Sequence, residues 1–259
     1  MEGQKKSVGL ALSGGGARGV AHMGVIKAFQ EAGIPIHAVS GTSMGALVGA
    51  LLANGFSPEE MLELLDKKHI KGLLHPSMKS HGLIKVGFKT TYLDEIMPYK
   101  TFEELKIPLF VSVSNITKGE LEVKSQGEYL PYVIASCSIP VVFPAQEIDG
   151  QCYVDGGLYD NLPAMSLYDQ CDYIVGVHVN FNGEEQIKNS MVQVAERCFQ
   201  LIIGNNVKKA LPHCNAIIEP HELRKYGTFD LKSKLKIFKI GYDYGRRIIK
   251  DKIIHDICS

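Results

Sequence analysis

Short apolar runs alternate with stretches of helical spacing in the first part of the chain. Val8–Leu12 is an apolar run that ends at three glycines, and apolar residues then recur at helical spacing from Val20 to Ala32. The pattern predicts a second strand over Ile36–Ser40 and a helix of small residues over Met44–Ala53 that ends at Gly55. Strands that alternate with helices are typical of a parallel sheet whose faces are covered by helices.

The later part of the chain carries the signals of a hairpin, a buried strand and two long helices. We expect the hairpin over Phe110–Asn115 and Leu121–Lys124, and the buried strand at Tyr173–Val179. Helical spacing predicts the two long helices over Ser190–Leu211 and Leu231–Ile254.

Residues 57–83 combine a capped helix with a polar segment. Ser57, Pro58 and Glu60 match an N-cap, a first-turn proline and a capping box, which predict a helix through Lys67. Residues 68–83 mix three histidines with glycines, serines and a proline, which predicts a loop that could act as a lid. The histidines recur every six residues, a spacing that matches no zinc motif, so we expect a solvated loop rather than a metal site.

The composition is typical of a globular protein without a nucleic-acid partner. The 259 residues include 28 lysines and arginines and 28 aspartates and glutamates, so the formal net charge is zero. The first residues contain no apolar stretch long enough for a signal peptide or a membrane span, so we expect a cytoplasmic protein. Since no internal repeat or linker is evident, we expect a single domain over residues 1–259, with a motif-bearing core at about 7–180 and a helical part at about 188–259.

Residues 41–45 match the G-x-S-x-G pattern of a nucleophile elbow, between a predicted strand and a predicted helix. Gly41 and Gly45 suit this motif because the serine, here Ser43, must sit on a cramped turn where flanking side chains would clash. The Ser43 hydroxyl would then be exposed at a helix N-terminus, which favours nearby negative charge. The alternative interpretation is that the small residues only let the strand and the helix pack closely.

A second glycine loop, at residues 14–19, permits two interpretations. Gly14, Gly16 and Gly19 spell G-x-G-x-x-G, the pattern of a dinucleotide site, but such a site requires an acidic residue about 20 positions further on. This chain has Ser-Gly-Thr-Ser there instead. Consecutive glycines can also direct several backbone N–H groups to one point, as an oxyanion hole requires. Because both glycine loops follow predicted neighbouring strands, the catalytic interpretation is favoured over nucleotide binding.

An aspartate followed by two glycines supplies a candidate base for the serine. Tyr153 and Val154 lead into Asp155, and Gly156 and Gly157 would let the backbone turn away below a carboxylate at a strand end. Four histidines that follow in the chain would permit a Ser-acid-His triad instead: His178, His213, His221 and His255. The first of them lies inside an apolar run and is interpreted as a core residue, so we do not expect a catalytic histidine.

The glycine loop, the elbow and the D-G-G sequence together resemble the patatin-like phospholipase family. Two further stretches, at residues 135–144 and 157–163, resemble family blocks, and all the blocks occur in the family's order over roughly residues 7–180. The resemblance implies an α/β fold with three α/β/α layers around a central, mostly parallel sheet. It also implies a serine esterase of the phospholipase A type that cleaves carboxylic esters of phospholipids or lysophospholipids.

The resemblance further implies a Ser-Asp dyad without a metal or an organic cofactor. Ser43 would be the nucleophile that becomes acylated, and Asp155 would be the general base. The oxyanion hole would consist of the amides of Gly14, Gly15 and Gly16, with Arg18 completing the loop. We keep two alternatives, a nucleotide-binding protein and a lipid-binding module without catalysis.

The predicted C-terminal helix is basic. Eight lysines and arginines lie between Lys232 and Lys252, beside Leu235 and Phe238, which leads to the hypothesis of a peripheral contact with anionic membranes. A solvated outer face on a packed helix is the alternative explanation. The sequence indicates no oligomeric state.

Overall fold

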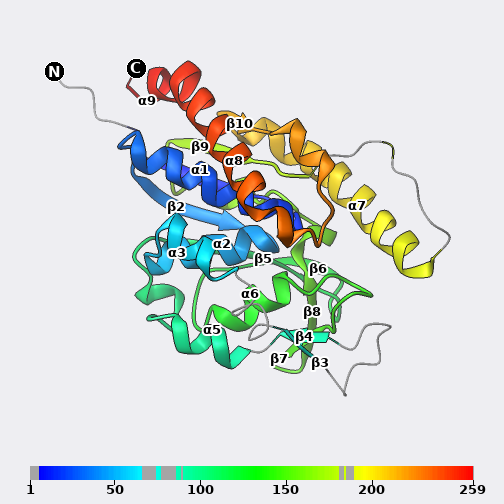
Figure 1. The fold of residues 1–259 in the computed structure, drawn as a ribbon. Helices are drawn as coiled ribbons and strands as arrows, with labels where there is room; N and C mark the ends of the chain where they lie inside the picture. Colours follow the sequence, from blue (N-terminus) through cyan, green and yellow to red (C-terminus); the bar gives the residue numbers. More distant parts are fainter. Residues whose placement is uncertain are drawn as a thin grey trace.

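The computed structural model describes residues 6–65, 74–76, 86–88, 90–180, 184 and 190–258. These residues form a mixed α/β fold around an eight-stranded sheet, with helices packed around it (Figure 1). The strand order is β10-β9-β1-β2-β5-β8-β7, and β6 also pairs with β5. The strands of the sheet are β1 (Val8–Leu12), β2 (Ile36–Gly41), β5 (Leu109–Asn115), β6 (Glu120–Lys124), β7 (Gln146–Ile148), β8 (Gln151–Asp155), β9 (Tyr173–Val177) and β10 (Ala216–Ile218).

The five predicted helices are present with differences at several ends, and α5 and α6 are two helices that the sequence did not predict. The α-helices are α1 (Val20–Glu31), α2 (Met44–Asn54), α3 (Pro58–Glu63), α5 (Thr90–Ile96), α6 (Leu130–Ser136), α7 (Met191–Ala210), α8 (Lys234–Ile248) and α9 (Ile254–Cys258). The capping box of α3 is confirmed, but the helix ends at Glu63 and not at Lys67. The predicted C-terminal helix is not continuous, because a π-helical turn at Ile249–Ile253 separates α8 from α9. Among the described helices, none combines the length and the apolar character of a membrane-spanning segment.

Most of the predicted loop at 68–83 lies outside the described residues. Within it, β3 (Leu74–Pro76) pairs antiparallel with β4 (Val86–Phe88), so the loop prediction is wrong for these three residues. Backbone pairing with a partner segment outside the predicted loop is a feature that local composition does not reveal.

The sheet is covered on both faces. Leu10 and Leu12 of β1 belong to a buried cluster that includes α1 and α2, whereas Ala11 belongs to a second cluster with Val207 and Ala210 of α7. Successive side chains of a strand point to opposite faces of a sheet, so helices pack on both faces. The three-layer arrangement predicted from the sequence is therefore confirmed.

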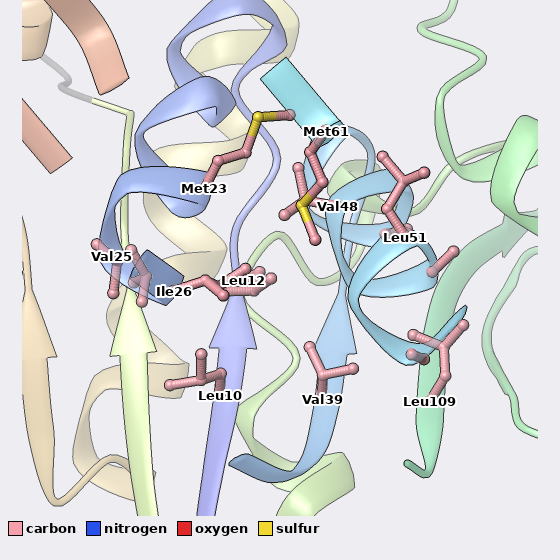
Figure 2. Close-up of a cluster of buried hydrophobic side chains, with 14 of the residues drawn as sticks. Leu10, Leu12, Met23, Val25, Ile26, Val39, Val48, Leu51, Met61 and Leu109 are labelled. Atoms are coloured by element: carbon pink, nitrogen blue, oxygen red, sulfur yellow. The ribbon is translucent and has the colours of Figure 1, made fainter. Parts of the chain in front are cut away.

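The larger cluster fills the space between the sheet and the first three helices (Figure 2). Each of its labelled side chains is at most 3% exposed, and full burial of such a side chain stabilises the fold by about 1.5–3 kcal/mol. They come from three strands and three helices: Leu10, Leu12, Val39, Leu109, Met23, Val25, Ile26, Val48, Leu51 and Met61.

Strands β2 and β8 approach each other along one edge of β5. β6 pairs with the opposite edge of β5. On the first edge, Val111 pairs with Gly41 of β2 and Val113 pairs with Asp155 of β8. β2 runs parallel to β5 and β8 runs antiparallel, so both strands end beside Ser112, the residue between these two pairs. The chain that follows β2 and the end of β8 are thereby brought to one point.

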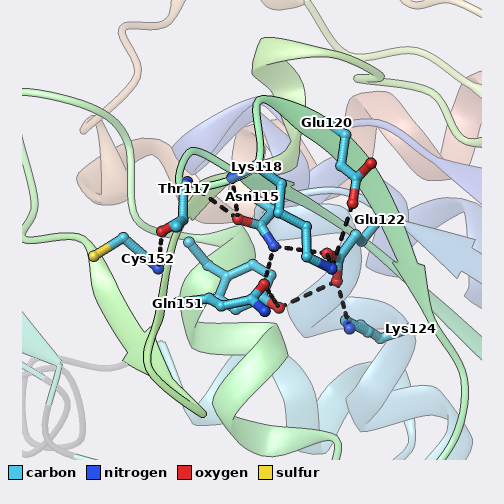
Figure 3. A network of polar contacts seen from close by, with 9 residues as sticks. Asn115, Thr117, Lys118, Glu120, Glu122, Lys124, Gln151 and Cys152 are labelled. Atoms are coloured by element: carbon cyan, nitrogen blue, oxygen red, sulfur yellow. Dashed lines mark hydrogen bonds and ion pairs between the residues drawn. The ribbon is translucent and has the colours of Figure 1, made fainter.

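A polar network holds β6, β5 and β8 together beyond this point (Figure 3). Asn115 of β5 donates hydrogen bonds to Glu122 of β6, at 2.7 Å, and to Gln151 of β8. Lys118 and Lys124 form ion pairs with Glu122 at 3.3 and 2.5 Å. Burial raises the pKa of Glu122, but the hydrogen bonds from Lys124 and Asn115 outweigh burial and lower it to about 2. The antiparallel position of β8 therefore has side-chain support in addition to its backbone pairing.

Helix α8 packs against α1 through glycines. A Cβ atom on Gly241 of α8 would overlap the backbone carbonyl of Ala21, and one on Gly24 of α1 would overlap the carbonyl of Phe238. The two helix backbones can approach this closely only because neither glycine carries a side chain.

We expect Gly241→Ala to lower the free energy of unfolding by about 1–3 kcal/mol, because the added methyl group meets backbone that cannot move aside. This loss should exceed the roughly 1 kcal/mol that alanine gains over glycine in a helix. Urea unfolding followed by circular dichroism measures the change. Gly227→Ala is the matched control, since a Cβ at Gly227 meets open space. Equal stability of Gly241→Ala and the parent protein would contradict the close packing of α1 and α8.

Candidate active site

Ser43 occupies a strained turn between β2 and α2. Its backbone has φ 56° and ψ −125°, a conformation that residues other than glycine rarely adopt. A Cβ atom on Gly41 would overlap the Gly45 carbonyl, and one on Gly45 would overlap the Leu12 carbonyl. The structure therefore has the elbow geometry that the sequence predicts, with glycines where side chains would clash.

Helix α6 holds the elbow in place from the side. The Ser43 N–H donates a hydrogen bond to Ser136 Oγ at 2.8 Å, and the Ser136 hydroxyl donates to the Ser112 carbonyl at 2.7 Å. All three residues are buried, with Ser43 only 6% exposed. A buried hydroxyl that both accepts and donates links α6 to β5 and to the elbow.

Asp155 faces Ser43 from the end of β8. Its carboxylate is 1% exposed, and its Oδ1 accepts a hydrogen bond from the Gly157 amide at 2.8 Å. Burial raises the pKa of Asp155 to about 7, although hydrogen bonds from the Ser43 side chain and the Gly157 amide lower it. The predicted serine and aspartate thus meet in the fold, and the aspartate titrates near neutral pH.

The glycine loop differs from the prediction in one of its three amides. The Gly14 N–H donates to the Asn161 carbonyl at 3.2 Å, so this group is already engaged. Within the described residues, the N–H groups of Gly15 and Gly16 have no hydrogen-bond acceptor. The structure thus leaves two amides of the loop available instead of the expected three.

Two peptide groups of this loop have fixed orientations. The Gly14 carbonyl accepts hydrogen bonds from Asn180 Nδ2 at 2.6 Å and from Ser13 Oγ at 3.0 Å. The Gly15 carbonyl accepts from the Arg18 N–H at 3.2 Å. In a trans peptide the C=O and the following N–H point in opposite directions. The N–H groups of Gly15 and Gly16 therefore point away from Asn180 and Arg18 respectively.

A partly open cavity of about 30 Å³ joins these groups. It is small, since a single water molecule accounts for about 30 Å³ of liquid. On one side it is bounded by Phe199, Gln200 and Ile203 of α7 and by Thr228. Its other lining residues are Gly14, Gly15, Gly16, Arg18, Ser43, Ile139, Asp155, Asn161 and Asn180.

The histidines that follow Asp155 do not line this cavity within the described residues. His178 is 7% exposed and its Nδ1 lies 3.0 Å from Glu219 Oε1, so it is a buried, hydrogen-bonded residue as expected. The other three, His213, His221 and His255, are exposed.

One histidine that the sequence did not single out supports the glycine loop. His22 of α1 is fully buried, and its Nε2 lies 2.8 Å from the Ser13 carbonyl. Burial lowers the pKa of His22 to about 4, so the ring is neutral and its Nε2–H donates to this carbonyl. Its position one turn after the glycine loop is the only sequence signal that could have indicated it.

The chain is similar to a described family and to several known proteins. It matches the family described as patatin-like phospholipase over residues 10–168. It is 29% identical over 285 residues to the lysophospholipase nte1 of Neurospora crassa, which covers 95% of this chain and 18% of the relative. It is 27% identical over 287 residues to the lysophospholipase NTE1 of Saccharomyces cerevisiae, a match that covers 97% of this chain and 17% of the relative. The chain therefore spans less than a fifth of the length of these relatives.

The fold is also similar to a solved structure. The crystal structure of VipD from Legionella pneumophila superposes with a TM-score of 0.55 at 19% identity, over 95% of this chain and 67% of that chain. This likeness concerns the fold alone. Since the family match covers more than half of the chain, the protein belongs to the patatin-like phospholipase family.

Proposed function

We propose that the protein is a serine lipid acyl hydrolase that cleaves carboxylic esters of phospholipids or lysophospholipids. The observation that carries the proposal is the hydrogen-bonded pair of Ser43 and Asp155, which lines one small cavity together with Gly15 and Gly16. Relatives named lysophospholipases support the substrate class.

In the first half of the proposed reaction, Ser43 Oγ forms a bond to the carbonyl carbon of the ester while its proton passes to Asp155. The π electrons of the carbonyl move to its oxygen, which the N–H groups of Gly15 and Gly16 stabilise by roughly 3 kcal/mol each. The C–O bond of the ester then breaks, and the departing alcohol takes the proton from Asp155. The acyl group remains on Ser43.

Water completes the cycle in the second half. The oxygen of a water molecule attacks the acyl carbon while Asp155 takes a proton from this water. The N–H groups of Gly15 and Gly16 again stabilise the carbonyl oxygen of the acyl group as it becomes negative. The bond to Ser43 Oγ breaks, Ser43 regains a proton from Asp155, and a free fatty acid leaves. A base with a pKa of about 7 suits this exchange, because its proton can be taken up and returned near neutral pH.

Substrate entry requires movement of the chain over the cavity. A lipid acyl chain needs a pocket of a few hundred Å³ at least, whereas this cavity holds about 30 Å³. Among the described residues, those that would have to move to admit an acyl chain are Phe199 and Ile203 of α7 and Thr228. We infer that α7 covers the cavity. Whether the loop predicted at residues 68–83 also acts as a lid is a separate hypothesis that concerns residues mostly outside those described.

A membrane-facing edge lies next to Thr228 in the chain. Phe229 and Leu235 are 56% and 66% exposed, and the exposed Lys232 and Lys236 flank them. Exposed apolar side chains among lysines suit the boundary between lipid headgroups and acyl chains. We therefore place the proposed membrane contact at the beginning of the basic helix. Further along it, Lys239 pairs with Asp243 at 2.6 Å, which reduces its availability.

A fluorophosphonate probe tests the proposed nucleophile. We expect the parent protein to be labelled, and Ser43→Ala to lose both labelling and the hydrolysis of a short p-nitrophenyl ester. Asp155→Asn should lower the hydrolysis rate by at least about 100-fold, since general-base catalysis contributes about 10²–10⁴-fold.

Ser190→Ala is the matched control, because Ser190 is exposed and its side chain makes no cap hydrogen bond. It should label like the parent. If folded parent protein neither labels nor hydrolyses esters, the proposal fails. Titration with NAD(P), followed by calorimetry, then tests nucleotide binding, and liposome binding without turnover would favour a lipid-binding module.

The raised pKa of Asp155 predicts two opposite pH dependences. Hydrolysis should increase with pH to a plateau above about pH 7, because the base must be ionised to accept a proton. The free energy of unfolding should instead decrease as pH rises. The folded state holds this proton to about pH 7, whereas the unfolded carboxyl loses it near its ordinary value of 3.8. The contribution of Asp155 to stability therefore falls as pH rises between these values.

Urea unfolding of Asp155→Asn and of the parent protein at a series of pH values measures the stability effect. The variant should gain stability relative to the parent as pH rises from about 4 to about 7. A difference that does not change with pH would show that Asp155 is not a desolvated carboxylate.

Sedimentation with anionic liposomes tests the membrane-facing edge. We expect the double variant Phe229→Asp, Leu235→Asp to bind liposomes at least about tenfold more weakly, because two apolar contacts become charged repulsions. It should still hydrolyse a soluble short-chain ester. Ile254→Asp is the matched control, since Ile254 is a 43% exposed apolar residue in α9. Unchanged binding of the double variant would place any membrane contact elsewhere.

A further inference from the structure

One buried polar side chain at the cavity has no role in the reaction described so far. Asn161 is 0% exposed, and neither its Oδ1 nor its Nδ2 has a hydrogen-bond partner among the described residues. It lines the same cavity as Ser43 and Asp155. An amide buried without partners destabilises a fold, so its presence beside reactive groups calls for a reason.

We propose that the side-chain amide of Asn161 is the third donor of the oxyanion hole, together with the N–H groups of Gly15 and Gly16. The inference rests on the proposed acyl transfer at Ser43 and adds a catalytic residue to it. Asn161 Nδ2 would donate to the carbonyl oxygen as that oxygen becomes negative, and no proton is transferred.

The side chain of Asn161 lies next to the reacting groups. A single point, the Cβ position that Gly14 lacks, lies 2.5 Å from Asn161 Oδ1 and 3.0 Å from Ser43 Cβ. The corresponding point at Gly157 lies 3.0 Å from both Asn161 Oδ1 and Asp155 Oδ1. Both distances end at the amide oxygen, so Oδ1 lies toward the nucleophile and the base. Nδ2, at the other end of the same amide group, carries two N–H donors and has no partner among the described residues.

The backbone of Asn161 is held from two directions. Its carbonyl accepts the Gly14 N–H at 3.2 Å, and its N–H donates to Asn206 Oδ1 of α7 at 3.0 Å. Asn206 Nδ2 in turn donates to the Gly157 carbonyl at 2.8 Å. A donor on a backbone fixed in this way is preorganised, which is the property that makes oxyanion holes effective.

These contacts also explain why the glycine loop needs another donor. The Asn161 carbonyl removes the Gly14 N–H from the expected set of three amides. The side chain of the same residue supplies an N–H at the same cavity. Asn180 lies on the other side of the peptide between Gly14 and Gly15. Its Nδ2 donates to the Gly14 carbonyl, whereas the Gly15 N–H points away from Asn180.

Kinetics of Asn161→Ala test the proposal. We expect kcat for a short p-nitrophenyl ester to fall about 100-fold with little change in KM, as when one oxyanion donor is removed. Inhibition by a trifluoromethyl ketone, whose adduct with serine carries the negative oxygen, should weaken by a similar factor. The midpoint of thermal unfolding should not fall, because the lost amide has no partner among the described residues.

Asn54→Ala is the matched control. Asn54 is 3% exposed, but its Nδ2 donates to the Ala50 carbonyl at 2.8 Å and to the Tyr129 hydroxyl at 3.0 Å. This variant should unfold at a lower temperature and keep kcat within twofold. Asn161→Leu provides a second test should Asn161→Ala not fold, since it removes both N–H donors and keeps nearly the same side-chain shape. It should lose at least as much kcat as the alanine variant.

The outcomes separate the two proposals. If Ser43→Ala retains activity, the proposed function itself fails. If Ser43→Ala is inactive but a folded Asn161 variant keeps kcat and ketone inhibition within threefold of the parent, only the role of Asn161 is overturned. A lower unfolding temperature with unchanged kcat would make Asn161 a structural residue.

Discussion

The meeting of Ser43 and Asp155 depends on two strands that reach the same place on β5 from opposite directions. β2 and β8 occupy one edge of β5 and both end beside Ser112. A purely parallel sheet could not produce this arrangement, because the carboxyl ends of its strands lie side by side and do not face each other. The polar network around Glu122 stabilises β8, the antiparallel strand on which this arrangement depends. The proximity of Ser43 and Asp155 is therefore a consequence of sheet topology.

Near this place the described part of the chain holds several buried polar groups that lack hydrogen-bond partners. Among the described residues, the buried side-chain atoms without partners belong to His22, Asn161, His178 and Asn180. Three of these residues hydrogen-bond to the backbone of Ser13 or Gly14, at the start of the glycine loop. Asp155 adds a carboxylate whose burial opposes its ionisation. Proteins tolerate such unfavourable groups mainly where function requires them, and the well-packed apolar clusters on both sheet faces offset their cost.

The sequence predicted the parts of this site that depend on local geometry. The elbow requires small residues at Gly41 and Gly45 whatever the rest of the fold does, and the capping box of α3 is equally local. The strands β7 and β10 were not predicted, because three residues carry too short a pattern to recognise. The engagement of the Gly14 N–H could not be predicted either, since its acceptor, Asn161, is remote in sequence and is brought near only by the fold.

Helix α7 limits how the site can open. Its residues Phe199 and Ile203 cover the cavity, while Asn206, less than one turn after Ile203, holds the backbone of Asn161 and the carbonyl of Gly157. A displacement of the whole helix would expose the cavity but would also release the segment that carries Asn161 and adjoins Asp155. Opening that preserves the site must therefore move the part of α7 before Asn206 and leave its last turns in place. The exposed Met191 and Val194 lie in the part of α7 before Asn206, so this part can shift without breaking the contacts that Asn206 makes.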